Sequence, residues 1–454
     1  MTRTLEADYL VVGAGAMGMA FTDALIDHAD VRVALVDRRH GVSGHWLEAY
    51  PFVRLHQASA FYGVASTRLG GHLQERGPEA GLHERASQAE ICDYYGRMLE
   101  RMVAGGHVEF FPNTEYLGDR TLLSRISGER LRVSEECRIV DAHYLAPSIP
   151  AETPPPFDVA DDATVLPVND LPRLEEAPSQ YVVVGSGKTA TDTVIWLLSR
   201  GVDPDAICWV RPRDPWMTNR TAIQPDPATF LGTAADTMKA AADATSLGDL
   251  FLRLEDAGIM LRIDRAVTPT MAKAPILATW ELDRLRTVEN VVRRGHITTV
   301  DRGRLSFADG SVVVSTDAVV VHCAADGMKY PPLVPVWRRE AITLQPIRAG
   351  FPCFGAALTG YVEATRDDDD EKNRLCPPSH YGNSLAQWAR MNVLGTRATM
   401  SFSAEPDIKE WANDVALNPV RVPAGYPESQ ALSDAQERLA RYTGPGLANL
   451  AVLE

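Results

Sequence analysis

The chain has 454 residues, of which 45% are hydrophobic and 23% charged, values that exclude a single small core, a disordered chain and a fibrous repeat. Its 45 lysines and arginines face 60 aspartates and glutamates, for a net charge of −15, which disfavours nucleic acid and anionic membranes as partners. We therefore expect a folded chain of enzyme size with two domains.

The targeting and cysteine patterns predict a cytoplasmic location. The first eight residues contain no long apolar stretch, and no later run approaches the roughly 18 apolar residues of a spanning helix. The cysteines form no C-x-x-C pair, so we expect neither a disulfide framework nor a metal site. They are Cys92, Cys137, Cys208, Cys323, Cys353 and Cys376.

The N-terminal segment has the pattern of a nucleotide-binding unit. Residues 8–12 form a short apolar run, and the apolar spacing over 17–26 predicts a helix. Residues 31–36 indicate the next strand. Strand, glycine turn, helix and strand in this order predict the first half of a Rossmann unit, with a parallel sheet buried on both faces.

The turn of this unit carries a dinucleotide motif. Gly13, Gly15 and Gly18 match G-x-G-x-x-G, in which the glycines allow the turn, the approach of a pyrophosphate and the packing of helix on strand. Asp37 ends the second strand, where a carboxylate accepts hydrogen bonds from ribose hydroxyls. We place the adjacent Arg38 in the same site. The motif predicts an adenine dinucleotide bound at the helix N-terminus.

The same order of elements returns later, with strands at 181–184 and 207–210 and a helix at 189–198. Its turn has the form G-x-G-x-x-A, in which alanine replaces the third glycine. The turn comprises Gly185, Ser186, Gly187, Lys188, Thr189 and Ala190. Val182 stands where a P-loop needs its first glycine, which excludes that motif. Two such units predict two nucleotide sites.

Two arginines distinguish the second site from the first. Arg211 and Arg213 follow the second strand of the unit, where an NAD site has an acidic residue. Guanidinium groups are natural partners of a 2′-phosphate. This favours NADP over NAD, the alternative being two solvated surface arginines.

The rest of the chain connects and extends these units. Five prolines within 147–156 indicate an extended connection. The spacing over 214–294 is helical, with helices expected at 234–242, 247–254 and 276–291, and longer than a Rossmann connection requires, which predicts a helical insertion. Strands at 304–307 and 312–314, joined through an Asp-Gly pair, predict a hairpin. We expect the chain to return to the first domain at 317–322.

Two further elements follow Asp37. They are Ser43-Gly44-His45-Trp46 and Tyr50-Pro51-Phe52-Val53-Arg54. In this order with the two glycine turns, they resemble the flavin-containing monooxygenases and Baeyer–Villiger monooxygenases, the class B flavoprotein monooxygenases. The resemblance implies FAD at Gly13, Gly15, Gly18, Asp37, Gly44 and Trp46. It implies NADPH at Gly185, Gly187, Lys188, Thr189, Arg211 and Arg213.

The resemblance also implies a domain order. The fold is then α/β, with an NADPH domain inserted into an FAD domain: 1–170 and 317–454 form the FAD domain and 171–316 the NADPH domain. Residues 352–360 are similar to the strand that brings backbone to the flavin, with a helix start at 382–391 behind it, and Gly360 joins the cofactor site. We expect a positive helix dipole near the flavin's N1 to O2 edge.

Candidate catalytic residues follow from the same segment. Arg54 is placed to stabilise negative charge on oxygen, and His56 and Gln57 are proton or hydrogen-bond partners. The alternatives are a structural ion pair for Arg54 and a satisfied, partly buried histidine for His56. We also count Gln57 among the cofactor-binding residues.

The sequence therefore predicts a monooxygenase that uses FAD and NADPH to insert one atom of molecular oxygen into a small molecule, by nitrogen, sulfur or Baeyer–Villiger oxidation. The alternative enzyme is a flavin-dependent dehydrogenase or reductase without oxygen transfer. Two departures from the families motivate it: their linker signature is not recognisable at residues 141–147, and residues 323–327 replace their Ala-Thr-Gly strand end with Cys-Ala-Ala-Asp-Gly. A nucleotide-sensing protein without turnover is a third reading, and homo-oligomerisation is left open.

Overall fold

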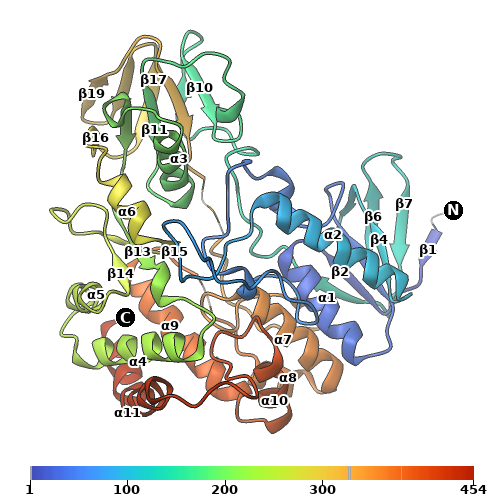
Figure 1. The fold of residues 1–454 in the computed structure, drawn as a ribbon. Helices are drawn as coiled ribbons and strands as arrows, with labels where there is room; N and C mark the ends of the chain where they lie inside the picture. Colours follow the sequence, from blue (N-terminus) through green and yellow to red (C-terminus); the bar gives the residue numbers. More distant parts are fainter. Residues whose placement is uncertain (1–2, 326, 328, 380) are drawn as a thin grey trace.

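The computed structural model describes residues 3–325, 327, 329–379 and 381–454, so Asp326 of the strand end discussed above lies outside the described residues. Its first unit is built on a five-stranded parallel sheet (Figure 1). In spatial order the strands are β21 (Ile342–Thr343), β8 (Arg138–Asp141), β2 (Tyr9–Val12), β3 (Val33–Val36) and β4 (Val108–Phe111). The strands expected at 8–12 and 31–36 are thus confirmed.

The first sheet is buried at its centre because strands β2 and β3 are apolar on both faces. All four residues of β3 are buried, as parallel sheets require. Helix α1 (Ala16–His28) follows the first glycine turn, and α2 (Gln88–Ala104) begins with a capping box between Ser87 and Glu90. A smaller sheet flanks the unit with the order β1 (Arg3–Leu5), β7 (Arg130–Val133), β6 (Thr121–Ser124) and β5 (Thr114–Tyr116).

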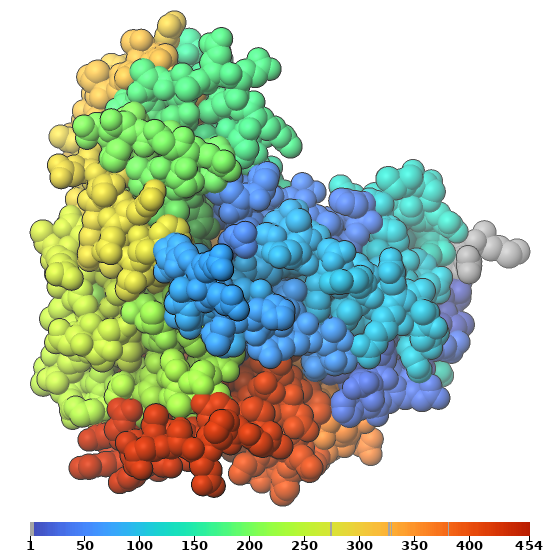
Figure 2. All heavy atoms as spheres, viewed as in Figure 1, coloured from blue at the N-terminus to red at the C-terminus, as the bar shows by residue number. Residues whose placement is uncertain are grey.

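The second unit forms a separate lobe that stands above the blue and cyan first unit in the space-filling view (Figure 2). Its sheet is also parallel. The strand order is β10 (Thr164–Pro167), β20 (Val319–His322), β11 (Tyr181–Val184), β12 (Ile207–Val210) and β16 (Val291–Val292). Helix α3 (Lys188–Ser199) follows the second glycine turn.

The return to the first sheet comes later than expected. The strand predicted at 317–322 is present as β20, but it pairs with β10 and β11 of the second sheet. The chain rejoins the first sheet at β21, beside β8. The error arises because a buried parallel strand is apolar in either sheet, so its composition does not identify its partners.

The predicted hairpin is confirmed within a small outer sheet. Strands β18 (Arg304–Phe307) and β19 (Gly310–Val313) pair antiparallel, and Gly310 has a φ of 139°, which favours glycine. β17 (Ile297–Asp301) and β9 (Asp158–Val159) complete this sheet.

The insertion at 214–294 is only partly helical. It contains α4 (Pro227–Asp243), α5 (Leu247–Asp256) and α6 (Thr279–Leu285). It also contains a three-stranded sheet in the order β14 (Met260–Leu261), β13 (Pro215–Asn219) and β15 (Met271–Leu277). The helix expected from residue 276 is wrong at its start, because β15 contains Pro275, which does not fit a helix interior, and pairs with β13 instead.

Helices form the C-terminal part of the chain and pack beneath the first unit and the insertion (Figure 1). They are α7 (Pro352–Thr365), α8 (Asp369–Leu375), α9 (Leu385–Phe402), α10 (Pro406–Asp414) and α11 (Gln430–Leu453). The charged run at 367–371 lies at the start of α8, where the Asp368 side chain caps the helix. No helix in the described ranges has the length and apolar character needed to cross a membrane.

The strand expected at 352–360 is wrong, because this segment is the first part of α7. Pro352 occupies the first helical turn, where it is well tolerated. Gly360 is buried against α1: a Cβ there would lie 2.4 Å from the carbonyl oxygen of Phe21. Gly360 therefore permits close packing of two helices, and it does not line the cavity described below.

Candidate functional site

One large cavity connects the two units, the insertion and the C-terminal helices. Its volume is about 1570 Å³, more than the roughly 300–1,000 Å³ of most ligand pockets. Of the residues predicted from sequence, Gly13, Gly15, Asp37, Arg38, Gly44, Trp46, Arg54, His56, Gln57, Lys188 and Thr189 line it. The cavity thus has room for a dinucleotide and a second molecule.

The first glycine turn is shaped for close approach. Gly13 has a φ of 108°, and a Cβ on Gly18 would overlap the carbonyl oxygen of Gly13 at 1.9 Å. A Cβ on Gly44 would lie 3.0 Å from the Cα of Gly15, and Gly44 itself has a φ of 58°. The two glycine segments therefore form a bare backbone cradle, and Gly18 acts behind it in helix packing.

Asp37 is fixed at the edge of this cradle. Its side chain is buried and accepts hydrogen bonds from the backbone N–H groups of Ala14 and Arg39, both at 2.8 Å. A carboxylate has about four acceptor positions, so capacity remains for ribose hydroxyls. Arg38 lies at the exposed rim, where it and Arg39 pair with Glu152 at 3.0 and 2.7 Å.

Trp46 and Gln57 continue the wall from this cradle. The indole N–H of Trp46 donates to the hydroxyl of Tyr62 at 2.6 Å, which fixes the ring. Gln57 is buried and lines the cavity. Trp46 and Gln57 therefore line the part of the cavity that adjoins the first glycine turn.

Arg54 is exposed and lines the cavity, and its guanidinium donates to the backbone carbonyl of Arg85 at 2.9 Å. The contact positions one guanidinium nitrogen of Arg54. Because the acceptor is a carbonyl and not a carboxylate, the positive charge of Arg54 is not neutralised there. A structural ion pair, the alternative weighed above, is not formed within 4.0 Å among the described residues.

His56 is a neutral imidazole at physiological pH. Burial, with further contributions from the cations Lys188, Arg85 and Arg220, lowers its pKa to about 3. Its Nδ1 is buried and finds no hydrogen-bond partner among the described residues. His56 is therefore suited to a hydrogen bond with a bound molecule and unsuited to carrying a stored proton.

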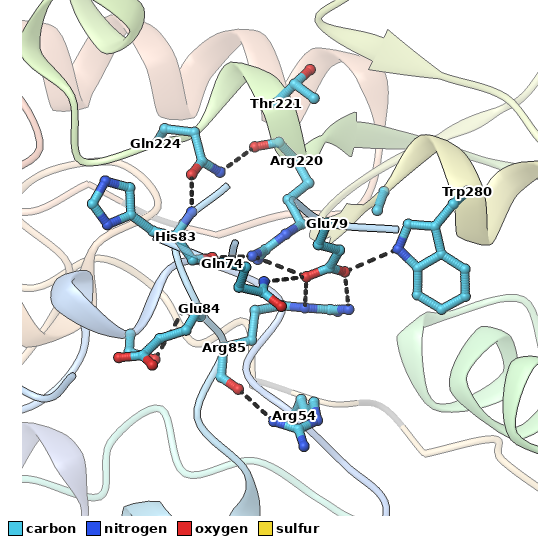
Figure 3. A network of polar contacts seen from close by, with 12 residues as sticks. Arg54, Gln74, Glu79, His83, Glu84, Arg85, Arg220, Thr221, Gln224 and Trp280 are labelled. Atoms are coloured by element: carbon cyan, nitrogen blue, oxygen red, sulfur yellow. Dashed lines mark hydrogen bonds and ion pairs between the residues drawn. The ribbon is translucent and has the colours of Figure 1, made fainter. Parts of the chain in front are cut away.

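A buried charge network lies behind this wall (Figure 3). Glu79 pairs with Arg85 and with Arg220, the latter at 3.2 Å, and accepts from the indole N–H of Trp280 at 3.1 Å. Arg85 also contacts Glu281 of α6 at 3.3 Å. The network joins the first unit to the insertion, which supplies Arg220, Trp280 and Glu281, and no local sequence motif marks it.

The second glycine turn adjoins the same network. Gly185 has a φ of 131°, and Gly187 is the N-cap of α3. The Lys188 ammonium lies 2.5 Å from Asp192 and 3.4 Å from Glu281, so its charge is already paired. The cavity reaches this turn at Lys188 and Thr189, whereas Gly185 and Gly187 shape the backbone behind them.

The two arginines after β12 have different environments. Arg211 is 2% exposed, lies 4.7 Å over the ring of Trp209 and pairs with Asp214 at 3.2 Å. Arg213 is exposed at the end of β12, and β12 lies beside the glycine turn, since the N–H of Gly185 donates to Val210 at 3.0 Å. The geometry leaves Arg213 accessible and turns Arg211 inward.

The far end of the cavity was not predicted from sequence. The insertion and the C-terminal helices line it mainly with apolar side chains: Phe230, Ala234, Met238, Ile259, Met260, Ile276, Trp388, Met391 and Leu439. The cation Arg348 also lies in this region. These residues come from segments far apart in the chain, so no local motif marks them.

Comparisons with known proteins identify relatives. No family model matches the chain. It is 40% identical over 421 residues to the uncharacterized protein Rv2000 of Mycobacterium tuberculosis and to the uncharacterized protein Mb2023 of Mycobacterium bovis, covering 92% of this chain and 78% of each relative. The chain belongs to this family. Its curated relatives carry no stated activity.

Solved structures give more distant likenesses. Cyclohexanone monooxygenase from Rhodococcus sp. Phi1 bound to NADP+ is 13% identical, with 99% of each chain covered and a TM-score of 0.49. An oxidized steroid monooxygenase bound to NADP is 13% identical, covering 98% and 99%, with a TM-score of 0.48. A flavin-containing monooxygenase from Stenotrophomonas maltophilia is 12% identical, covering 90% and 99%, with a TM-score of 0.43. Likenesses of this size do not decide an activity.

Proposed function

We propose that the protein is an FAD- and NADPH-dependent monooxygenase that inserts one oxygen atom into a small molecule. The observation that carries this proposal is a single cavity that runs from one glycine turn to the other and ends in an apolar chamber. Two dinucleotides and a substrate need this arrangement, because hydride and oxygen are transferred only between groups held together.

The first unit fits FAD. The backbone cradle of Gly13, Gly15 and Gly44 suits a pyrophosphate, since added Cβ atoms would narrow it. Asp37 would hold the ribose, and Trp46 and Gln57 would border the part of the cofactor that reaches the centre of the cavity. Bound FAD would supply hydride acceptance and the activation of molecular oxygen.

The second unit fits NADPH. Its glycine turn and the start of α3 would hold the pyrophosphate, with Thr189 at the cavity wall. Arg213 would bind the 2′-phosphate, while Arg211 would support it only through the fold. The sequence predicted that both arginines bind the 2′-phosphate, whereas we now propose that Arg213 alone binds it.

The chain's own contribution to chemistry is positioning, charge and exclusion of water. Arg54 supplies a fixed cation at the wall, and neutral His56 supplies a hydrogen bond. The apolar side chains at the far end exclude water from the substrate. The alternative enzyme, a dehydrogenase or reductase, uses the same sites and is favoured by the two departures from the family pattern, at residues 141–147 and at the Cys323-Ala324-Ala325 strand end.

The test begins with the purified protein loaded with FAD. Denaturation should release FAD rather than FMN, and NADPH should drive oxygen consumption that a suitable amine, thioether or ketone increases. Release of FMN, or turnover sustained by an anaerobic electron acceptor with no oxygenated product, would rule out the monooxygenase. The cytoplasmic location and any homo-oligomer stay predictions.

A further inference from the structure

Arg348 lies in the apolar end of the cavity and has no carboxylate partner within 4.0 Å among the described residues. It follows β21, and its guanidinium donates to the hydroxyl of Thr399 on α9 at 2.8 Å. Its Cζ lies 6.0 Å from the ring centroid of Phe230 on α4. Its Nε is buried and has no hydrogen-bond partner among the described residues.

The acidic residues of the cavity lie elsewhere. Those that line it are Asp37, Glu48, Glu115 and Glu152, all from the first unit. Some other cavity cations do have carboxylate partners, for example Lys188 with Asp192 and Glu281. Burial alone lowers the pKa of Arg348 to about 10, so it stays charged at neutral pH without a carboxylate beside it.

A buried cation without an anion is costly unless a ligand supplies the anion. Phe230 lies beside this cation, and the apolar side chains Met238, Trp388 and Met391 line the same cavity. The start of α7, at Pro352, lies in the same wall and adds partial positive charge. The chamber therefore combines one anion-binding group with a broad apolar surface.

We propose that the substrate is an apolar carboxylic acid whose carboxylate pairs with Arg348 while its hydrocarbon part lies against α4 and α9. This rests on the proposed function for the reaction, but the binding preference can be measured without turnover. Guanidinium groups bind carboxylates through paired, charge-assisted hydrogen bonds. Arg348 could instead pair with the negative charge of the reduced cofactor. The experiment distinguishes this partner from a substrate carboxylate.

The experiment measures binding to the FAD-loaded protein by calorimetry with two matched pairs of probes: decanoate against decanamide, and phenylacetate against phenylacetamide. The native protein should bind at least one acid roughly ten- to a hundredfold more tightly than its amide, as expected for charge-assisted hydrogen bonds. Arg348→Met should abolish that preference, and Arg348→Lys should keep part of it. Thr399→Val, which keeps the cation, is the control and should retain most of the preference.

Two results would overturn the proposal. The first is equal binding of acid and amide by the native protein, which needs no variant. The second is an unchanged preference in Arg348→Met; a shift of the flavin reduction potential in the same variant would then assign the cation to the cofactor. Failure of oxygen transfer alone would contradict the proposed reaction and leave this binding result intact.

Discussion

Arg220 is fully buried, and its guanidinium lies 3.2 Å from the carboxylate of Glu79, a residue of the first unit 141 positions earlier in sequence than Arg220. Burial alone would raise the pKa of Glu79, but Arg85 and Arg220 together lower it. The carboxylate is therefore ionised at neutral pH and ties the insertion to the first unit.

Replacing Glu79 by Gln should strongly destabilise the protein, because it leaves buried cations uncompensated. We expect a loss of about 3–5 kcal/mol in the free energy of unfolding, measured by denaturant unfolding at neutral pH. The control is Asp93→Asn, which removes an exposed pair with Arg97 and should change stability by less than about 1 kcal/mol. Equal effects of the two variants would show that the buried network does not stabilise the fold.

The same carboxylates predict a loss of stability in acid. Arg85 and Lys188 overcome the effect of burial and lower the pKa of Glu281 to about 2. A carboxylate whose pKa is lowered on folding adds stability above its unfolded pKa of 4.5 and loses it as pH falls towards 2. Glu281→Gln should be less stable at neutral pH, with a flatter decline over this window in unfolding measured at successive pH values. A parallel decline in both proteins would contradict this.

His56 contributes in a different pH window. Its pKa falls from 6.5 in the unfolded chain to about 3 in the folded protein, so the unfolded state binds more protons between these values. Stability should then fall as pH drops through this window, by up to about 1.4 kcal/mol per pH unit. In His56→Asn the dependence of the free energy of unfolding on pH should be weaker by up to about 1.4 kcal/mol per pH unit, the contribution of one proton. NMR titration showing a His56 imidazole that protonates near 6.5 would refute the assignment.

The two arginines after β12 should separate binding from folding. Arg213→Ala should lower NADPH affinity roughly ten- to a hundredfold and leave NADH little affected, because it removes charge-assisted contacts to the 2′-phosphate. Arg211→Ala should instead lower stability, because it leaves Asp214 with Arg293 as its remaining partner. Coenzyme dissociation constants and unfolding curves for both variants decide this, and a larger loss of NADPH affinity in Arg211→Ala would reverse the two roles.

The cradle of the first unit predicts a selective loss of FAD. In Gly44→Ala the new Cβ meets backbone at 3.0 Å in a left-handed conformation, whereas in Gly41→Ala it meets only the side chain of Leu47 at 3.8 Å. We expect the first variant to retain less FAD, by roughly tenfold in affinity from strain of about 1–2 kcal/mol, and the second to match the native protein. Flavin fluorescence after denaturation measures both, and full FAD content in Gly44→Ala would contradict the site.

Local patterns predicted the parts of the fold that local geometry determines. The turn at Gly13 and the hairpin at Gly310 follow from conformations that glycine adopts readily, and both are present. The strand predicted from Pro352 to Gly360 was wrong because a short apolar run with glycines fits either a strand or a tightly packed helix. Partnerships such as Glu79 with Arg220 form between distant segments and leave no periodic signal.

The most direct test of the central claim is the fate of molecular oxygen. The FAD-loaded protein is mixed with NADPH, isotopically labelled O₂ and a panel of amines, thioethers, ketones and apolar carboxylic acids, and the products are analysed by mass spectrometry. A monooxygenase places one labelled atom in a product, with NADPH consumed in equal amount. Recovery of all labelled oxygen as hydrogen peroxide or water with no labelled product, while an anaerobic acceptor sustains NADPH oxidation, would contradict the account and assign the protein as a dehydrogenase.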